Sequence, residues 1–170
     1  MQLSDMEPME SIIPSLFWER TSAWAERVAL RSKELGLWKN ITWGEYGEHA
    51  GYVASALVDL GLLKGDRVTI MSENCPEWLY ADMGALTAGG ISAGIYPTDS
   101  DAQVHYILNN CQSRFHFVEN EEQLDKILSV RDGLGFLEKI IVFDMKGLKR
   151  FEDPMVMGFD ALLALGKSVE

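Results

Sequence analysis

The chain has 170 residues, a net charge of −11 and 47% hydrophobic residues. This length is enough for a domain with a sizeable core, and the composition is typical of a globular protein. The negative charge excludes a nucleic-acid-binding protein, because contacts to phosphates need clustered lysine and arginine.

The two cysteines, Cys75 and Cys111, stand far apart and form no C-x-x-C motif. They are not the framework of a small secreted domain, so we expect buried, reduced thiols in a cytoplasmic protein. The N-terminus is acidic and Pro14 interrupts its apolar run, which is unlike a signal peptide. Leu79–Pro97 has the length of a membrane span, but its four glycines favour a buried helix followed by a buried strand.

The first third of the chain predicts a helix and a β-hairpin. Ser11–Glu26 has the apolar spacing of a short helix. Val28–Arg31 and Trp38–Thr42 are short extended runs, and Lys33–Gly36 lies between them as a turn. These runs predict two antiparallel strands.

Beyond the hairpin, extended runs alternate with helical patterns. Short links between them predict parallel strands joined by right-handed crossovers, with helices on both faces of the sheet. Gly147–Gly158 has no regular pattern and is expected to be a surface loop. Expected strands are Arg67–Met71, Ile91–Ile95, Phe115–Val118 and Lys139–Phe143. Expected helices run from Thr42 to Gly61, over Glu77–Ala88, from Ser100, from Asn120 and over Phe159–Leu165. Asn74 is expected to cap the second of these helices, with Pro76 in its first turn, and Asn120 with Gln123 repeats the capping pattern.

Two segments carry recognisable motifs: Leu86–Ser100 (LTAGGISAGIYPTDS) has an Ala-Gly-Gly core, and Ile41–Gly47 has a Thr-aromatic-x-x-Tyr pattern. Both resemble core motifs of the adenylate-forming, AMP-binding superfamily, and within it the long-chain acyl-CoA synthetases. Gly94–Thr98 (GIYPT) is closer to the acyl-CoA branch than to amino-acid-adenylating domains. The resemblance extends from about Leu16 to the end of the chain.

The resemblance implies a two-step reaction in which ATP and Mg²⁺ activate a fatty acid as acyl-adenylate, and the thiol of CoA then displaces AMP. The family uses a Ser/Thr/Gly-rich phosphate loop with a following lysine, a Thr-Glu pair for magnesium, an aspartate on the ribose and a lysine on a C-terminal domain. The sequence contains none of these. We therefore interpret residues 1–170 as the N-terminal part of the adenylation domain, inactive alone, with no catalytic or metal-binding residue and with unknown cofactor-binding residues.

The glycines of this motif do not predict a phosphate-binding loop. They close a helix and enter a strand, whereas a phosphate loop follows a strand and opens a helix. We interpret them as a helix C-cap and as sites of tight packing. The glycines are Gly84, Gly89, Gly90 and Gly94.

Ligands of open α/β sheets bind beyond the carboxyl ends of the strands. Acidic residues follow these ends in the sequence, and they would cap helices and repel phosphate. Trp78 and Tyr96 are our candidates for the wall of an acyl channel, because long apolar ligands need aromatic and aliphatic surroundings. The alternative is that both belong to the core.

The three histidines, His49, His105 and His116, lack the spacing of metal ligands. The expected partners are a fatty acid and the remainder of the parent chain, with a homodimer and peripheral membrane contact as further options; no nucleic acid is expected. Two alternatives stay open: a non-catalytic α/β domain that binds an acyl chain or a partner, and an acyl-AMP ligase that feeds a carrier protein. A nucleotide-binding oxidoreductase is a weaker option, because no strand is followed by a G-x-G-x-x-G turn.

Overall fold

The structure is a computed structural model that describes residues 12–169. The chain divides into two compact units, residues 1–48 and residues 49–170, with the boundary inside one helix. Ser11, where the first helix was predicted to begin, and most of the acidic N-terminus lie outside the described residues.

The first unit contains the predicted helix and hairpin. α1 (Ile13–Ala23) precedes β1 (Val28–Glu34) and β2 (Leu37–Thr42), which pair antiparallel. The prediction of a four-residue turn over Lys33–Gly36 was wrong, because both strands are longer than predicted. Only Leu35 and Gly36 separate them. Both have positive φ, 48° and 84°, which is typical of a type I′ turn.

The predicted capping box begins α2 (Trp43–Asp59). The Thr42 amide donates to Glu45 Oε2 at 2.7 Å, and the Glu45 amide donates to Thr42 Oγ1 at 3.2 Å. This reciprocal pair satisfies two backbone donors at the start of the helix. In the same unit the buried ring of Phe17 meets Tyr46 edge-on, with 4.7 Å between ring centroids.

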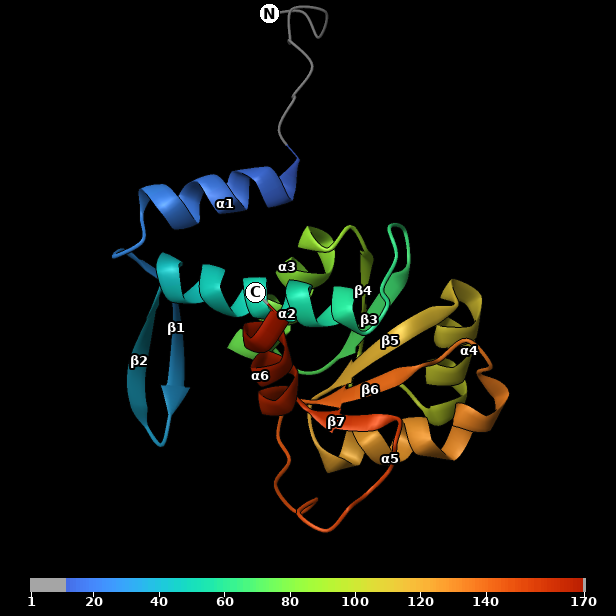
Figure 1. The fold of residues 1–170 in the computed structure, drawn as a ribbon. Coiled ribbons are helices and arrows are strands. Elements are labelled where there is room, and N and C mark those ends of the chain that lie inside the picture. The colour runs from blue at the N-terminus through green and yellow to red at the C-terminus, as the bar shows by residue number, and fades with distance from the viewer. Residues whose placement is uncertain (1–11, 170) are drawn as a thin grey trace, which may run out of the picture. The chain divides into compact units, whose positions relative to one another are not determined.

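The second unit is built on a five-stranded parallel sheet with the order β4-β3-β5-β6-β7 (Figure 1). The predicted α/β class, a mostly parallel sheet preceded by a hairpin, is therefore confirmed. The strands are β3 (Arg67–Met71), β4 (Ile91–Ile95), β5 (Ser113–Val118), β6 (Lys139–Val142) and β7 (Val156–Gly158). After α2 the helices are α3 (Pro76–Thr87), α4 (Asp101–Cys111), α5 (Glu121–Val130), η2 (Arg131–Gly133) and α6 (Phe159–Val169).

Helices cover both faces of this sheet. The chain moves from β3 to β4 through α3, then returns through α4 to β5 on the other side of β3. Because parallel crossovers are right-handed, this reversal places α4 and α5 on the face opposite α3, as Figure 1 shows. One apolar core joins side chains of α4 and α5 to the strands. On the other face Phe159 of α6 packs edge-on against Phe143, with 5.2 Å between centroids.

One strand was missed by the sequence prediction. β7 lies inside Gly147–Gly158, which was expected to be an irregular loop, and it pairs parallel to β6 with Ile140 opposite Val156. Three residues are too few to show an alternating pattern, and the pairing comes from the neighbouring strand. α6 also extends beyond the predicted Phe159–Leu165, to Val169.

The predicted helix caps have mixed outcomes. The Ser100 capping box is present, with both reciprocal hydrogen bonds to Gln103. Asn120 caps α5 by accepting from the Glu122 amide at 2.9 Å, but Gln123 does not complete a box; it is buried and its Oε1 has no hydrogen-bond partner.

The Ala-Gly-Gly motif ends α3 as expected. Gly89 has a φ of 84°, and its amide donates to the Leu86 carbonyl while the Gly90 amide donates to the Ala85 carbonyl. This pattern is a Schellman motif, which satisfies carbonyls that the helix end leaves unpaired. The interpretation of these glycines as a C-cap is confirmed.

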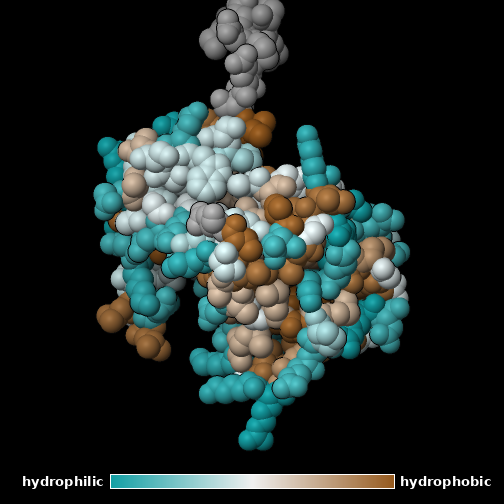
Figure 2. Space-filling view, in the orientation of Figure 1, coloured by the Kyte–Doolittle hydropathy of each residue, from teal (hydrophilic) through white to brown (hydrophobic). Residues whose placement is uncertain are grey.

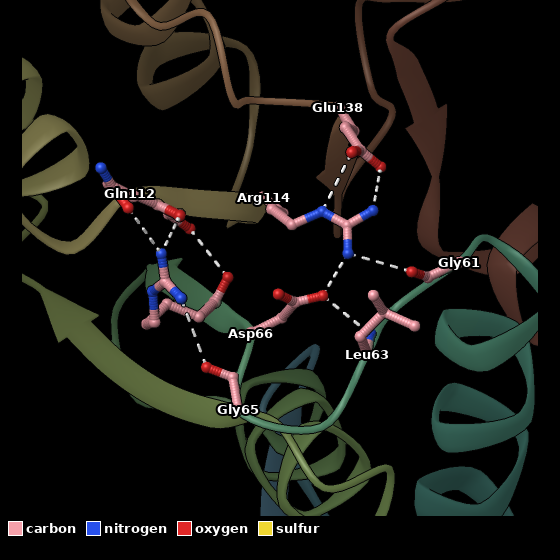
Figure 3. Close-up of polar contacts among 9 residues, drawn as sticks. Gly61, Leu63, Gly65, Asp66, Gln112, Arg114 and Glu138 are labelled. Carbon is pink, nitrogen blue, oxygen red and sulfur yellow. Dashed lines mark hydrogen bonds and ion pairs between the residues drawn. The ribbon is translucent and has the colours of Figure 1, made fainter.

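An ion-pair network joins the amino ends of three strands (Figure 3). The Arg114 guanidinium donates to both oxygens of Glu138, at 2.9 and 2.7 Å, to Asp66 and to the Gly61 carbonyl. Arg67 beside it donates to the carbonyls of Cys111 and Gln112, at the end of α4. Ligands of such sheets bind at the carboxyl ends of the strands. The network lies at the opposite edge of the sheet.

Candidate functional site

The candidate site lies where β3 and β4 end. The two strands are neighbours and run parallel, with Met71 opposite Ile95 at their last pair. The segments that follow them, Ser72–Asn74 and Tyr96–Thr98, therefore leave the sheet at the same edge. They border an open pocket of about 500 Å³, within the size range of small-molecule sites.

Both aromatic residues singled out in the sequence line this pocket. Trp78 comes from the first turn of α3, and Tyr96 follows the last residue of β4. Trp78 is half-buried, whereas Tyr96 is 77% exposed. Tyr96 is therefore not part of the core. The residues around the pocket are Ser72, Glu73, Asn74, Trp78, Gly94, Ile95, Tyr96, Pro97 and Thr98.

A glycine leaves room for the indole. A Cβ added to Gly94 would lie 3.6 Å from Cζ2 of Trp78 and would meet no other atom within 4 Å. The indole therefore lies over the backbone of β4, and the space beside it is open. A side chain at position 94 longer than alanine would reach into the pocket.

The turn from β3 into α3 is held by Ser72. Its hydroxyl donates to the Glu73 carbonyl at 2.7 Å and lies 3.4 Å from Sγ of Cys75. The sequence predicted that Asn74 caps the helix, and this was wrong. Cys75 is the N-cap residue, it makes no side-chain cap hydrogen bond, and Pro76 follows it. Proline needs no partner for a backbone N–H at this position, so the helix begins there without Asn74.

Neither cysteine is an activated nucleophile. Both are free but only half-buried, so the expectation that they are buried was wrong. Burial raises the pKa of the Cys75 thiol, and burial also raises the pKa of Cys111. A thiol with a raised pKa is protonated at neutral pH and reacts slowly.

A lysine on α5 supports the pocket. In the sequence, Asp125 and Lys126 have the charges of a solvated helix face, but the Lys126 side chain is only 20% exposed. Its ammonium donates to the Pro97 carbonyl at 2.5 Å. Lys126 thus ties α5 to the segment that carries Tyr96. No sequence pattern signals this contact, because the two residues are far apart in the chain and meet only when α4 and α5 pack on the sheet.

The charges at this edge do not fit the phosphates of a nucleotide. Glu119, at the end of β5, accepts a hydrogen bond from the Glu73 amide at 2.7 Å, so a carboxylate already occupies that donor. The first turns of the neighbouring helices carry Glu77, Asp101 and Glu121. Carboxylates at helix N-termini satisfy the helix dipole and repel further anions. We therefore assign no phosphate contact to the described residues.

The other candidate groups are not brought together. His49 lies on α2, His105 on α4 and His116 on β5. Among residues 12–169 there is no group of three or more His, Cys, Asp or Glu that could hold a metal ion. Within the same residues no helix is both long and apolar enough to cross a membrane; Leu79–Pro97 is divided between α3 and β4.

Comparison with known proteins gives a consistent family. A model described as "AMP-binding enzyme" matches residues 17–156. The long-chain-fatty-acid–CoA ligase ACSBG2 of Xenopus laevis is 36% identical over 157 residues, covering 92% of this chain and 21% of that protein. The long-chain-fatty-acid–CoA ligase heimdall of Drosophila melanogaster is 33% identical over 133 residues, covering 76% of this chain and 20% of that protein. The chain thus spans about a fifth of the length of these curated relatives.

Solved structures share the fold. The anthranilate CoA ligase AuaEII, in complex with anthranoyl-AMP, superposes with a TM-score of 0.80 at 24% identity, covering 96% of this chain and 30% of that chain. The A-PCP didomain of a carboxylic acid reductase from Segniliparus rugosus, in complex with AMP, has a TM-score of 0.81 at 13% identity, with 96% and 27% covered. At these identities the likeness concerns the fold.

Proposed function

The chain belongs to the AMP-binding enzyme family, and we propose that it is the N-terminal part of an AMP-forming long-chain fatty acid–CoA ligase of the cytoplasm. The whole enzyme would use ATP and Mg²⁺ to convert a fatty acid into acyl-adenylate, and CoA would then take the acyl group. The names of the relatives support CoA, rather than a carrier protein, as the acceptor.

The pocket between β3 and β4 carries the proposal for these residues. It combines an indole, a phenol and the end of an apolar strand at the carboxyl edge of the sheet, where ligands of this architecture bind. The surrounding carboxylates do not fit phosphates, but they do not oppose an uncharged hydrocarbon chain. Trp78 and Tyr96 would therefore contact the acyl part of the substrate, and nucleotide phosphates would be bound by residues outside this chain.

The first experiment tests where the catalytic groups are. The 170-residue chain is incubated with ATP, Mg²⁺, palmitate and CoA, and pyrophosphate release is followed. We expect none from this chain and steady release from the full-length enzyme. Turnover by the 170 residues alone would refute the placement of the catalytic groups elsewhere.

A second experiment tests the pocket in the full-length enzyme. Gly94→Val adds an isopropyl group beside Trp78, and valine suits a strand. We expect kcat/KM for palmitate to fall about tenfold, because the lost space removes several apolar contacts, while the value for a short-chain acid stays near that of the wild type. Equal effects on both acids would show that the pocket does not hold the distal acyl chain.

The non-catalytic alternative is favoured by one observation: the residues that line the pocket all lie between Ser72 and Thr98, within this chain. It predicts that the 170-residue chain binds palmitate without ATP. Calorimetric titration of wild type and Gly94→Val would decide this, since a binding domain loses affinity in the variant and a mere fragment binds in neither form.

A further inference from the structure

The free end of the β1–β2 hairpin exposes three large apolar side chains. Leu35 is fully exposed, Leu37 is 73% exposed and Trp38 is 67% exposed. They fall within four consecutive positions, and Figure 2 shows hydrophobic surface gathered at this end of the hairpin. Apolar residues scattered singly over a surface need no explanation, but a contiguous group marks a contact with another apolar phase.

The turn itself gives no reason for a leucine. Leu35 has a φ of 48°, where an L-residue with a large side chain is disfavoured by about 1–2 kcal/mol. Asparagine or glycine is the usual residue at this position of a type I′ turn. The side chain makes no packing contact that would offset this cost, because it is fully exposed. The benefit of a leucine must then come from outside the folded chain.

Basic residues stand directly behind the apolar end. Arg31, Lys33 and Lys39 lie on the two strands, against one acidic residue, Glu34. This is the opposite sign to the chain as a whole, whose net charge is −11. Lys39 pairs with Glu34, and Lys33 lies 6.0 Å from the ring centroid of Trp38.

The strand register distributes these groups around the hairpin. Lys33 is opposite Trp38, and Glu34 is opposite Leu37. Because cross-strand partners share a face and successive residues alternate, Trp38 and Leu37 lie on opposite faces. The hairpin thus ends in apolar side chains on both faces, with Lys33 level with Trp38 and Lys39 one residue further from the turn.

We propose that the end of this hairpin inserts into the interface of an anionic lipid bilayer. Leucine enters the acyl boundary, tryptophan prefers the headgroup level and basic side chains bind anionic headgroups. A second copy of the chain fits less well, since the cations of one hairpin would meet the same cations of the other. This inference does not depend on the proposed ligase function, because the hairpin would bind lipid whatever the chain catalyses.

The test is flotation of the 170-residue chain with vesicles of phosphatidylcholine and phosphatidylglycerol, compared with phosphatidylcholine alone. We expect binding to the mixed vesicles, weakening as NaCl is added because headgroup contacts are screened. Leu35→Asn should lower the partition coefficient about tenfold through the lost apolar transfer. Asparagine accepts positive φ more readily than leucine, so this variant should fold at least as well.

Leu63→Asn is the matched control, because Leu63 is also a 66% exposed leucine but lies outside the hairpin. It should bind vesicles like the wild type. The proposal is overturned if the wild type does not float with anionic vesicles, or if Leu63→Asn weakens binding as much as Leu35→Asn. Hairpin-dependent dimerisation on size exclusion without vesicle binding would also overturn it, in favour of a second copy.

Discussion

The Thr69 hydroxyl lies 2.8 Å from Nδ1 of His116 on the neighbouring strand, with both side chains fully buried. Thr69 Oγ1 is also 2.8 Å from Ser113 Oγ, and Ser113 Oγ donates to the Phe115 carbonyl at 2.9 Å. Because a carbonyl only accepts, this chain of hydrogen bonds runs from the histidine to the carbonyl. Nδ1 is thus the protonated nitrogen, and Nε2 is left buried without a partner.

This arrangement makes stability depend on pH. Burial lowers the pKa of His116 from 6.5 to about 3. Below pH 6.5 the histidine becomes protonated in the unfolded chain but stays neutral in the folded chain. The stability that this difference removes is therefore fully present above pH 6.5 and is lost as the pH falls toward 3. We expect the free energy of unfolding to drop by about 2 kcal/mol from this group between pH 7 and pH 5.

Urea unfolding at pH 7, 6 and 5 measures this slope. His116→Gln lacks the titrating group, so its unfolding free energy should be lower at pH 7 but nearly constant over the same range. Parallel slopes in the two proteins would show that His116 is not the responsible group.

The ion-pair network at the amino edge gives a second prediction. Hydrogen bonding to Glu138 raises the pKa of Arg114; burial raises the pKa of Asp66, but hydrogen bonds from Leu63 and Arg114 outweigh it and bring it below 3.8. Arg114→Met should lower the free energy of unfolding by about 2–3 kcal/mol, because Asp66 is left without its partner. Arg114→Lys should cost about half as much, since one ammonium cannot hold both carboxylates.

The matched control is Arg150→Met, an exposed arginine before β7, which should change stability by less than about 0.5 kcal/mol.

The lowered pKa of Asp66 also makes the free energy of unfolding depend on pH. The stability that Asp66 contributes is present above pH 3.8 and is lost as pH falls further. Asp66→Asn should abolish this loss, and an unchanged acid limb in that variant would contradict the assignment.

Close packing of α2 against α3 gives a third prediction. A Cβ on Gly84 would lie 2.5 Å from Cγ1 and 2.6 Å from Cβ of Val53, and 3.1 Å from the Ala50 carbonyl. Alanine favours a helix over glycine by about 1 kcal/mol, but this overlap cannot be relieved by rotating the far end of a side chain. We expect Gly84→Ala to destabilise the protein by about 1–3 kcal/mol on balance.

Two further variants isolate the cause in thermal or urea unfolding. Val53→Ala removes the atoms that the new methyl group meets, so the double variant should be more stable than the two single changes predict when added. Gly135→Ala meets nothing within 4 Å and should be nearly neutral. Additive effects at positions 53 and 84 would rule out the overlap as the cause.

The sequence predicted those features that neighbouring residues determine. The capping boxes at Thr42 and Ser100 and the glycine that ends α3 follow from bonds within one turn of helix. That Trp78 and Tyr96 lie at one edge of the sheet could also be anticipated, because parallel neighbouring strands deliver their following residues to one edge. What failed needed tertiary information: β7 pairs only at the end of the sheet, and Leu35 adopts a backbone conformation that its residue type disfavours.

Lys126 shows why part of the site could not be predicted. Its contact with Pro97 joins residues on different elements, and a charged residue beside Asp125 has the same appearance in sequence as a solvated helix face. Cys75 is a similar case, since it takes the N-cap position that asparagine would ordinarily occupy. Both positions are determined by how α3, α4 and α5 pack on the strands.

Lys126 gives the last prediction, because its bond to Pro97 is the tie between α5 and the pocket segment. Lys126→Met keeps the apolar stem but removes the donor, so the segment from Tyr96 to Asp99 should open more often. The Asp99 amide, which donates to the Tyr96 carbonyl at 3.0 Å, should exchange with deuterium about tenfold faster, while global stability falls by about 1 kcal/mol. Lys149→Met, at an exposed lysine, should change neither value. If exchange rises equally throughout the sheet, the variant has merely lowered global stability and Lys126 does not hold the pocket segment in place.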